Sequence, residues 1–410
     1  MDFDLIFRDA RIAGREERCV DIGIRDGRFA AVEAGLPGGG PEERLDGRLV
    51  LPGLVETHIH LDKSRLTARC NCHTGTVQEA IAEVARAKRD FTEEDVYERA
   101  RRTLERAILQ GTTRMRSHVE VDPRIGLTSL RALLRLKRDY AWAIDLRLCA
   151  FPQEGLLDDP GCEDVLVQAL EAGADAVGGA PYMDRDSHGQ IARIFALARR
   201  YDLDIDLHLD FSLDPSHFDL EEVCRLADAC RWGGRVAIGH VTKLSAVPRE
   251  RFEALGRRLA DAGIALTVLP STDLFLNGQG HEHSVPRGVA PAHRLLAAGV
   301  TCSLATNNVL NPFTPFGDCS LVRIANLYAN IAQIGTPADI AGCLDMVTTQ
   351  PAALLNLADY GIAPGRPADL VVLDAASRAA AVAEIAPPLT VVKAGRRTVT
   401  RPRPLLHRPG

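Results

Sequence analysis

Short apolar runs, rich in β-branched residues, alternate with longer amphipathic stretches through the middle of the chain. Strand–helix alternation of this length predicts a parallel sheet. About eight such units over roughly 250 residues or more predict a (β/α)₈ barrel. A doubly wound open sheet is the alternative, but no GxGxxG motif follows the first strand. The predicted strands span residues 54–61, 112–121, 145–152, 175–182, 204–211, 235–242, 265–270 and 301–307, and the clearest helical stretches span residues 76–90, 95–111 and 290–299.

The two ends of the chain differ from its middle. Residues 3–34 have the alternation and turn signals of short strands, and Asp26-Gly27 between two alternating runs predicts a hairpin. From residue 364 onward the pattern becomes β-like again. We therefore expect residues 1–50 and 364–405 to form one small β-sandwich-like domain beside a barrel of residues 51–363.

Composition and charge limit the classes of binding partner expected for this 410-residue chain. It is 46% hydrophobic and 25% charged, as in ordinary globular proteins. The net charge is −6 without any block of like charge, which favours neither nucleic acid nor an anionic membrane as a partner. No apolar run approaches the roughly 20 residues of a membrane span, and we read no signal peptide at the start. The 10 scattered cysteines predict reduced thiols and a cytoplasmic protein.

The stretch GLVETHIHLDKS places His58 and His60 two residues apart on a predicted strand. Residues i and i+2 of a strand point to the same side, so both imidazoles reach one spot. Such a pair is typical of a metal site, although on spacing alone a chance pair on a half-exposed strand is an equal alternative.

Other polar residues end the remaining predicted strands. In a (β/α)₈ barrel the active site lies where the strands end, so these side chains form one constellation. Their joint placement favours a metal site over a set of unrelated core histidines. The residues are His58, His60, Asp62, His118, Glu120, Asp122, Gln153, Glu154, His208, Asp210, His240, Ser271, Thr272, Asp273, Thr306, Asn307 and Asn308.

In these residues the chain resembles the amidohydrolase superfamily, and most closely its cytosine deaminase-like branch. The similarity covers nearly the whole chain, and the ordered set of motifs is far more specific than His-X-His alone. The matching stretches are LPGLVETHIHLDKS (51–64), RSHVEVD (116–122), AFPQEG (150–155), DLHLD (206–210), GHVTKLS (239–245), ATNNVLNPFTPFGD (305–318) and GIAPGRPADLVVLD (361–374).

The resemblance implies a role for several residues. His58, His60 and His208 would bind one divalent metal ion, with zinc expected first and iron as the alternative. His240 would contact the attacking water or the substrate, and Gln153 would touch the substrate ring. The metal would lower the pKa of water toward about 7 for attack on a ring carbon. The ligand histidines must be neutral, so binding should weaken in acid.

Two positions depart from the family pattern. Asn307 stands where the family has an aspartate that ligates the metal and accepts a proton, and Phe211 stands where the deaminases carry a proton-shuttling glutamate. An amide oxygen can ligate a metal but cannot take the proton. The remaining candidates for the base are His240, Asp273, Asp210 and Glu120, of which His240 is the first choice. We count Phe211 and His118 among the residues that contact the substrate.

Lys63 follows the His-X-His-X-Asp run at the expected mouth of the barrel. It is either a solvated surface lysine or an ammonium that binds an anionic group of the substrate. Asp62 is expected to orient one of the ligand histidines.

Several functions fit these observations. The first is a metal-dependent hydrolase that attacks a ring carbon of a small nitrogen heterocycle, of cyclic amide or amidine type, in heterocycle catabolism. Hydrolytic desulfurisation of a thiohydantoin-like ring bearing a carboxylate and deamination of cytosine or another pyrimidine are alternatives. A catalytically silent barrel that binds a small molecule is an alternative from another class. The retention of His58, His60, His208 and His240 argues against it. The sequence leaves open whether the chain forms a homo-oligomer.

Overall fold

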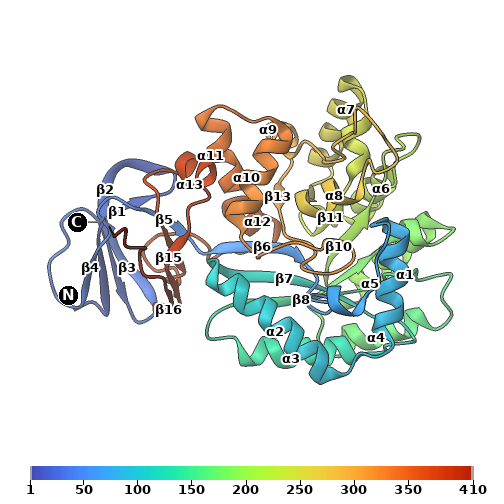
Figure 1. The fold of residues 1–410 in the computed structure, drawn as a ribbon, viewed down its shortest axis with the longest axis horizontal. Helices are drawn as coiled ribbons and strands as arrows, with labels where there is room; N and C mark the ends of the chain where they lie inside the picture. The colour runs from blue at the N-terminus through green and yellow to red at the C-terminus, as the bar shows by residue number, and fades with distance from the viewer. Residues whose placement is uncertain (1, 408–410) are drawn as a thin grey trace.

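Eight parallel strands form the first of two sheets in the computed structural model, which describes residues 2–407. They pair in the order of the sequence, from β6 to β13, and Figure 1 shows the helices that connect them. All eight lie within two or three residues of the predicted strands. The strands are β6 (Leu54–Ile59), β7 (Thr112–Glu120), β8 (Asp145–Phe151), β9 (Ala176–Gly179), β10 (Asp204–Leu209), β11 (Val236–His240), β12 (Ile264–Val268) and β13 (Cys302–Leu304).

The first and last strands meet, which closes the sheet into a barrel. Asn307, just beyond β13, donates its backbone N–H to the carbonyl of His58 at 2.8 Å and accepts from the backbone N–H of His60 at 2.9 Å. Ile59 and Asn307 form a parallel bridge at this point. The predicted (β/α)₈ barrel is confirmed, and its closure brings two candidate site segments side by side.

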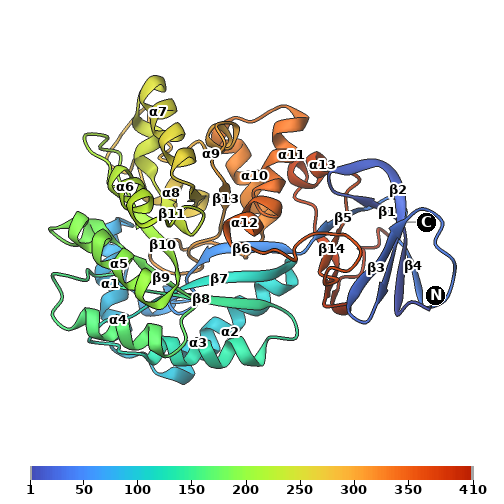
Figure 2. The same ribbon diagram turned by 180° about the vertical axis from the view of Figure 1, so that it is seen from behind.

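Helices surround the barrel, as Figures 1 and 2 show. α2 illustrates why they form: its buried residues Val96, Ala100 and Leu104 recur at helical spacing, and Thr92 caps its first turn by accepting from the N–H of Asp95. The helices are α1 (Val77–Lys88), α2 (Glu93–Leu109), α3 (Thr128–Asp139), α4 (Cys162–Glu171), α5 (Ser187–Tyr201), α6 (Leu220–Cys230), α7 (Arg249–Asp261), α8 (Pro270–Leu276), α9 (Ala292–Ala297), α10 (Leu321–Ala332), α11 (Pro337–Asp345), α12 (Thr349–Leu354) and α13 (Arg378–Ala383).

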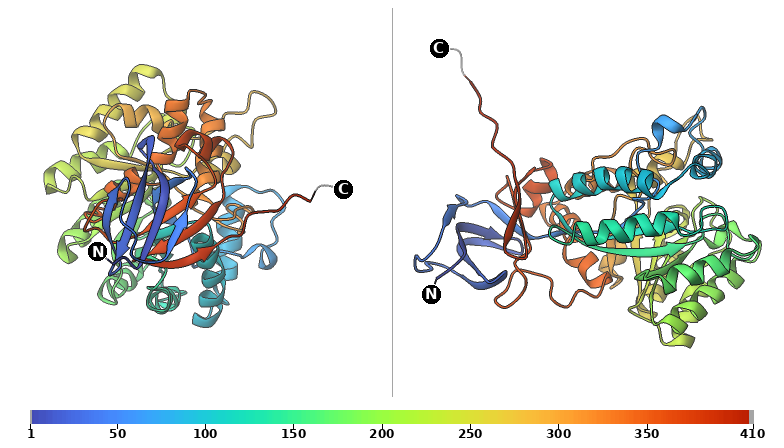
Figure 3. Two further views of the ribbon diagram at one scale, coloured as in Figure 1. Left: turned by 90° about the vertical axis from the view of Figure 1, so that its left-hand side faces the viewer. Right: turned by 90° about the horizontal axis from the view of Figure 1, so that it is seen from below.

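Strands from both ends of the chain form the second sheet, which we call the β-domain (Figure 3). β5 pairs with β14, and this contact joins the two chain ends. The predicted hairpin is confirmed: Asp26 and Gly27 link β2 to β3 with φ values of 50° and 74°. We retain 1–50 and 364–405 as the proposed extent of this domain. Its strands are β1 (Leu5–Ile12), β2 (Arg15–Arg25), β3 (Arg28–Glu33), β4 (Glu42–Arg44), β5 (Leu49–Pro52), β14 (Leu370–Leu373), β15 (Pro388–Lys393) and β16 (Arg396–Thr400).

The β-domain adjoins the end of the barrel at which β6 begins, because β5 leads into β6 across Gly53. The carboxyl ends of the barrel strands lie at the opposite end, where the sequence predicts the site. No helix within residues 2–407 has the length and apolar character to cross a bilayer. All ten cysteines are unpaired in the described part of the chain.

Candidate active site

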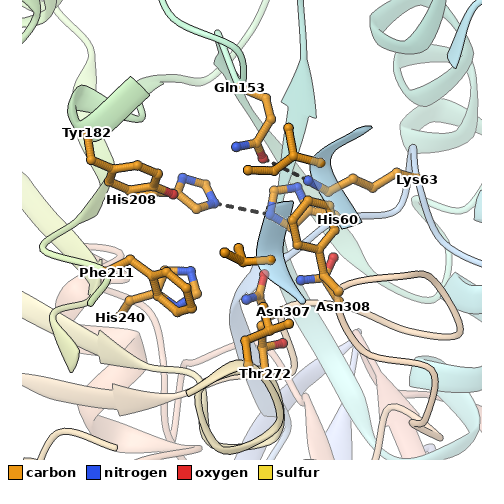
Figure 4. A pocket seen from close by; sticks show the side chains of 14 residues that line it. His60, Lys63, Gln153, Tyr182, His208, Phe211, His240, Thr272, Asn307 and Asn308 are labelled. Carbon is orange, nitrogen blue, oxygen red and sulfur yellow. Dashed lines mark hydrogen bonds between the residues drawn. The ribbon is translucent and has the colours of Figure 1, made fainter. Parts of the chain in front are cut away.

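Four buried imidazoles meet inside the barrel, and we call them the histidine cluster: His58, His60, His118 and His208. None is more than 3% exposed. The Nε2 atom of His208 lies 3.1 Å from that of His58. It lies 3.2 Å from that of His60, as Figure 4 shows. Ring nitrogens of His58, His118 and His208 also lie within 4.8 Å of one another. Strands far apart in the sequence thus bring four potential ligands to one spot.

The cluster carries polar atoms that lack protein partners. These atoms are Nδ1 of His58, His60 and His208, both ring nitrogens of His118, and Oδ1 of Asn307. Buried polar atoms are normally hydrogen-bonded, and the Nε2 atoms of His58, His60 and His208 have only one another as partners, so the place where they meet calls for a ligand. Nitrogen donors with one oxygen donor fit a divalent ion such as zinc. The residues present therefore fit the metal that the sequence predicts.

Burial keeps these histidines in the form that binds a metal. It lowers the pKa of His58, His60 and His208 well below the usual 6.5, and neighbouring positive charges lower each further. The same holds for His118. A neutral imidazole is the ligating form, so the ring nitrogens are available at ordinary pH.

Asp206 lies behind the histidine cluster, two residues before His208 on β10. Its carboxylate pairs with the guanidinium of Arg116 and lies 3.5 Å from Nε2 of His118 and 4.0 Å from Nδ1 of His58. Burial raises its pKa to about 6, although Arg116 opposes the shift. Carboxylates behind ligand histidines orient them. Sequence reasoning missed Asp206, although its i−2 spacing from His208 places both side chains on one side of the strand.

The expected role of Asp62 is wrong. Its two carboxylate oxygens accept the backbone N–H groups of Lys63, at 2.9 Å, and Glu120, at 2.8 Å. It therefore joins the end of β6 to the end of β7. The carboxylate that lies near the histidines is that of Asp206.

Lys63 belongs to a buried ionic group, the lysine–carboxylate cluster of Lys63, Lys88, Glu120, Asp122 and Glu154. Lys63 is 2% exposed, so the surface alternative for it is wrong. Its Nζ donates to Oε1 of Glu120 at 2.7 Å and to Oε1 of Gln153 at 2.9 Å.

Lys88 completes this cluster from α1. Its Nζ contacts Glu120 at 3.0 Å, Asp122 at 2.7 Å and Glu154 at 2.6 Å. Burial alone would raise the pKa of Glu120, but the two lysines lower it to about 2. Each buried charge in this cluster thus has an opposite charge at contact distance.

A cavity opens beside His60 and His208, which line it (Figure 4). Of the predicted site residues, His58, His118 and Asp273 are not among its lining. Tyr182, in the short helix after β9, lines the cavity and was missed; the only signal for it was its place as the last residue of the predicted strand 175–182. The lining residues are His60, Lys63, Val77, Ile81, Gln153, Tyr182, His208, Phe211, His240, Thr272, Leu276, Asn307, Asn308 and Phe313.

His240 and Asp273 form a buried pair beside the cavity. Nδ1 of His240 lies 2.5 Å from Oδ1 of Asp273, whose Oδ2 accepts the backbone N–H of Leu269 at 3.1 Å. Burial raises the pKa of Asp273, and His240 opposes the shift. Because this contact occupies Nδ1, Nε2 of His240 is free to exchange a proton with a group in the cavity.

Strained backbone occurs at two of the cavity positions. His240 has a φ of 71° and Asn307 a φ of 63°, in the left-handed region that most residues avoid.

The ring of Phe211 stands edge-on to that of His240, with 4.7 Å between the ring centres. No carboxylate is among the cavity-lining residues of the described chain. His240 is therefore the group best placed to move a proton there.

Comparisons with known proteins agree with this arrangement. Residues 134–399 match the family model described as "Amidohydrolase family". The chain is 28% identical to the N-isopropylammelide isopropyl amidohydrolase of Pseudomonas sp. (strain ADP), over 96% of this chain and 97% of that protein. It is 30% identical to the pterin deaminase of Rhizobium rhizogenes, over 87% of this chain and 82% of that protein.

A solved structure is similar over almost the full length. The 5-methylcytosine deaminase from Klebsiella pneumoniae, liganded with 5-fluorocytosine, superposes with a TM-score of 0.93 at 30% identity, covering 98% of this chain and 99% of that one. Fold, strand-end histidines and sequence similarity thus lead to one result: the chain belongs to the amidohydrolase family and is a hydrolytic enzyme of that type.

Proposed function

We propose that this enzyme uses one divalent metal ion to hydrolyse a bond at a ring carbon of a small nitrogen heterocycle, of cyclic amide or amidine type. The observation that carries the proposal is the meeting of Nε2 of His208 with those of His58, at 3.1 Å, and His60, at 3.2 Å, beside the cavity that His60 and His208 line. The cavity combines apolar side chains such as Val77, Ile81 and Phe313 with a few polar groups, as small-molecule sites commonly do. The names of the relatives, an ammelide derivative, a pterin and a methylated cytosine, support a heterocycle.

His58, His60 and His208 would hold the ion, zinc first and iron as the alternative, with the neutral Oδ1 of Asn307 as a further donor. His58 and His208 are common to this set and to the close group that includes His118. His60 lines the cavity and His118 does not, which favours His60 as the third ligand. When bound, such an ion acidifies water and polarises an oxygen of the substrate.

His240 supplies the proton transfer in this proposal. Asp273 holds its Nδ1, so Nε2 accepts a proton from the attacking water and later returns it to the leaving group. The Asp273 carboxylate stabilises the positive charge that His240 carries in between. This assignment needs no acid at Phe211 and no carboxylate at Asn307.

Hydrolytic desulfurisation is a second candidate, supported by the cavity's lack of a lining carboxylate. Sulfide needs less proton delivery than ammonia, so a thiohydantoin-like ring fits a site in which Phe211 covers His240. A carboxylate on that ring would find its partner in Lys63, the lysine of the lining.

The test is a hydrolysis assay of the metal-loaded and the chelated protein. The panel contains N-alkyl ammelide, pterin, cytosine, hydantoin and a thiohydantoin, with ammonia, amine and sulfide measured separately. We expect turnover of at least one ring, and its loss on chelation. No bound metal at all would favour the silent barrel instead, whereas stoichiometric metal without turnover of any ring would exclude the substrates of this panel.

A second variant tests the argument against cytosine. Asn307→Asp should keep the metal without gaining cytosine deamination, because Phe211 still leaves no acid near the ring. A competent cytosine deaminase from Asn307→Asp alone would contradict the role that we give to Phe211.

A further inference from the structure

We infer that the cavity selects a ring with two oxo or thioxo acceptors over the corresponding amino-substituted ring, because hydrogen bonds to Lys63 and Asn311 fix the side-chain amides of Gln153 and Asn308 as donors. This inference rests on the proposed function in taking a heterocycle as the occupant of the cavity. It adds the pattern of donors and acceptors that this heterocycle carries.

The orientation of Gln153 follows from Lys63. An ammonium can only donate, so the Gln153 atom at 2.9 Å from Nζ is the amide oxygen. Lys63 is itself held by Glu120 at 2.7 Å, and Glu120 by Lys88 at 3.0 Å. The amide cannot turn over without placing its N–H groups against the ammonium. Its Nε2 is therefore the end left for the cavity.

The orientation of Asn308 follows from Asn311 by the same reasoning. The backbone N–H groups of Phe313 and Thr314 donate to one Asn311 atom, at 3.0 and 3.1 Å, which makes that atom the oxygen. The other atom, Nδ2, donates to Oδ1 of Asn308 at 2.8 Å and to the carbonyl of Lys63 at 3.2 Å. Asn308 thus keeps Nδ2 for the cavity, and Asn311 is a positioning residue.

The acceptors of the cavity are fewer. Thr314 donates its hydroxyl to the carbonyl of Phe313 at 2.8 Å, so Thr272 is the donor of the 2.6 Å contact between the two hydroxyls. This leaves the lone pairs of the Thr272 oxygen as an acceptor, and Oδ1 of Asn307 already serves the metal proposal. Nε2 of His240 likewise serves the proposed proton transfer, and the Tyr182 hydroxyl can both donate and accept. Lys63, Gln153 and Asn308 therefore offer fixed donors against the hydroxyl oxygens of Thr272 and Tyr182, with no carboxylate in the described lining.

This imbalance has a consequence for specificity. A ring with two carbonyl oxygens satisfies the donors, whereas an amino substituent places N–H against N–H and leaves buried donors unpaired. Cyclic imides and ureides, such as hydantoins, dioxopyrimidines and oxo-triazines, have the required acceptors, and a single ring N–H can face Thr272.

The test measures equilibrium binding to the metal-loaded protein by calorimetry. The matched probes are uracil with cytosine and hydantoin with 2-iminohydantoin, each pair differing by one oxo-to-nitrogen exchange. We expect the oxo ring of each pair to bind about tenfold more tightly or better. The oxo ring accepts one hydrogen bond where the amino ring would place its N–H against a donor of the protein. Equal affinities, tighter binding of the amino rings, or no measurable binding of either oxo ring would overturn the inference.

Two nearly isosteric variants locate the effect. Asn308→Asp and Gln153→Glu keep an oxygen for Asn311 or Lys63 and exchange the cavity-facing NH₂ for an oxygen. Each should reduce the oxo preference by about tenfold, whereas Asn330→Asp, on the exposed side of α10, should not change it. An unchanged preference in both cavity variants would contradict the assignment. The wild-type comparison decides the matter should either variant fail to fold.

The result is separable from the proposed function. A protein that prefers oxo rings but hydrolyses none would retain this inference and refute the function. A protein that hydrolyses rings and binds the amino members more tightly would do the reverse.

Discussion

The histidine cluster and the lysine–carboxylate cluster lie at the same end of the barrel and share the ends of β6 and β7, yet their hydrogen bonding is opposite. His60 is three residues from Lys63, and His118 is two residues from Glu120. In the first cluster the imidazoles keep ring nitrogens without partners. In the second, Lys63, Lys88 and Glu120 all contact groups of opposite charge.

The difference separates a binding role from a supporting one. An unpaired buried polar atom costs free energy and is retained where a ligand completes it. A fully paired buried ion cluster needs no ligand, and it costs several kcal/mol to break because the remaining charge stays buried. We therefore expect substitutions in the first cluster to remove metal and activity, and a substitution at Lys88, which is not part of the described cavity lining, to act mainly on stability.

The largest effect should come from His208→Ala. His208 contacts both His58 and His60, so its loss should strip the metal and bring hydrolysis to background. Metal content by mass spectrometry and the rate of hydrolysis check this together. His188→Ala, at a histidine with a 59% exposed side chain, is the matched control and should keep both. Full metal occupancy in His208→Ala would show that the ligand assignment is wrong.

The next effect should come from the proton-transfer pair. His240→Ala should lower kcat by about 10²- to 10⁴-fold, the usual range for general acid–base catalysis, while the metal is retained. Asp273→Asn should cost about 10- to 100-fold through the lost orientation of His240. His293→Ala is the control. Nδ1 of His293 is also hydrogen-bonded, to the hydroxyl of Tyr328, but His293 is not part of the cavity lining. A normal kcat in His240→Ala would require another proton acceptor.

The lysine–carboxylate cluster should respond through stability. Lys88→Met leaves Glu120, Asp122 and Glu154 short of a cation and should cost about 3–5 kcal/mol of unfolding free energy. Lys137→Met removes the contact with Asp175 at 2.7 Å, where the lysine side chain is 33% exposed, and should cost about 1 kcal/mol or less. Urea unfolding gives both values. A loss of metal from folded Lys88→Met would mean that the two clusters are not separable.

The smallest effect should be that of moderate acid on metal binding. The pKa values of His58, His60 and His208 lie well below 6.5 in the folded protein, so protons compete with the metal only below those values. The Kd for the metal should therefore stay nearly constant from pH 8 to pH 6. Ligand histidines with ordinary pKa values would weaken binding by up to about tenfold per pH unit for each histidine below 6.5. Such a fall between pH 7 and pH 6 would contradict the effect of burial.

The sequence alone determined the architecture and the location of the site. Eight apolar runs separated by amphipathic helices specify a (β/α)₈ barrel, since each strand must bury both faces and each helix one. Because parallel strands all end at one side of the barrel, residues as distant as His58 and His208 could be placed together without coordinates. The i, i+2 spacing of His58 and His60 likewise predicts a shared direction.

The tertiary structure alone decided which polar residues are satisfied and by whom. Sequence spacing could not show that Lys63 is buried against Glu120, that Asp62 holds backbone N–H groups, or that Asp206 lies behind the histidines. Each of these contacts joins side chains from different strands or loops. Their partners depend on distances of a few tenths of an ångström, and such distances are set by the packing of the whole barrel rather than by any local run of residues.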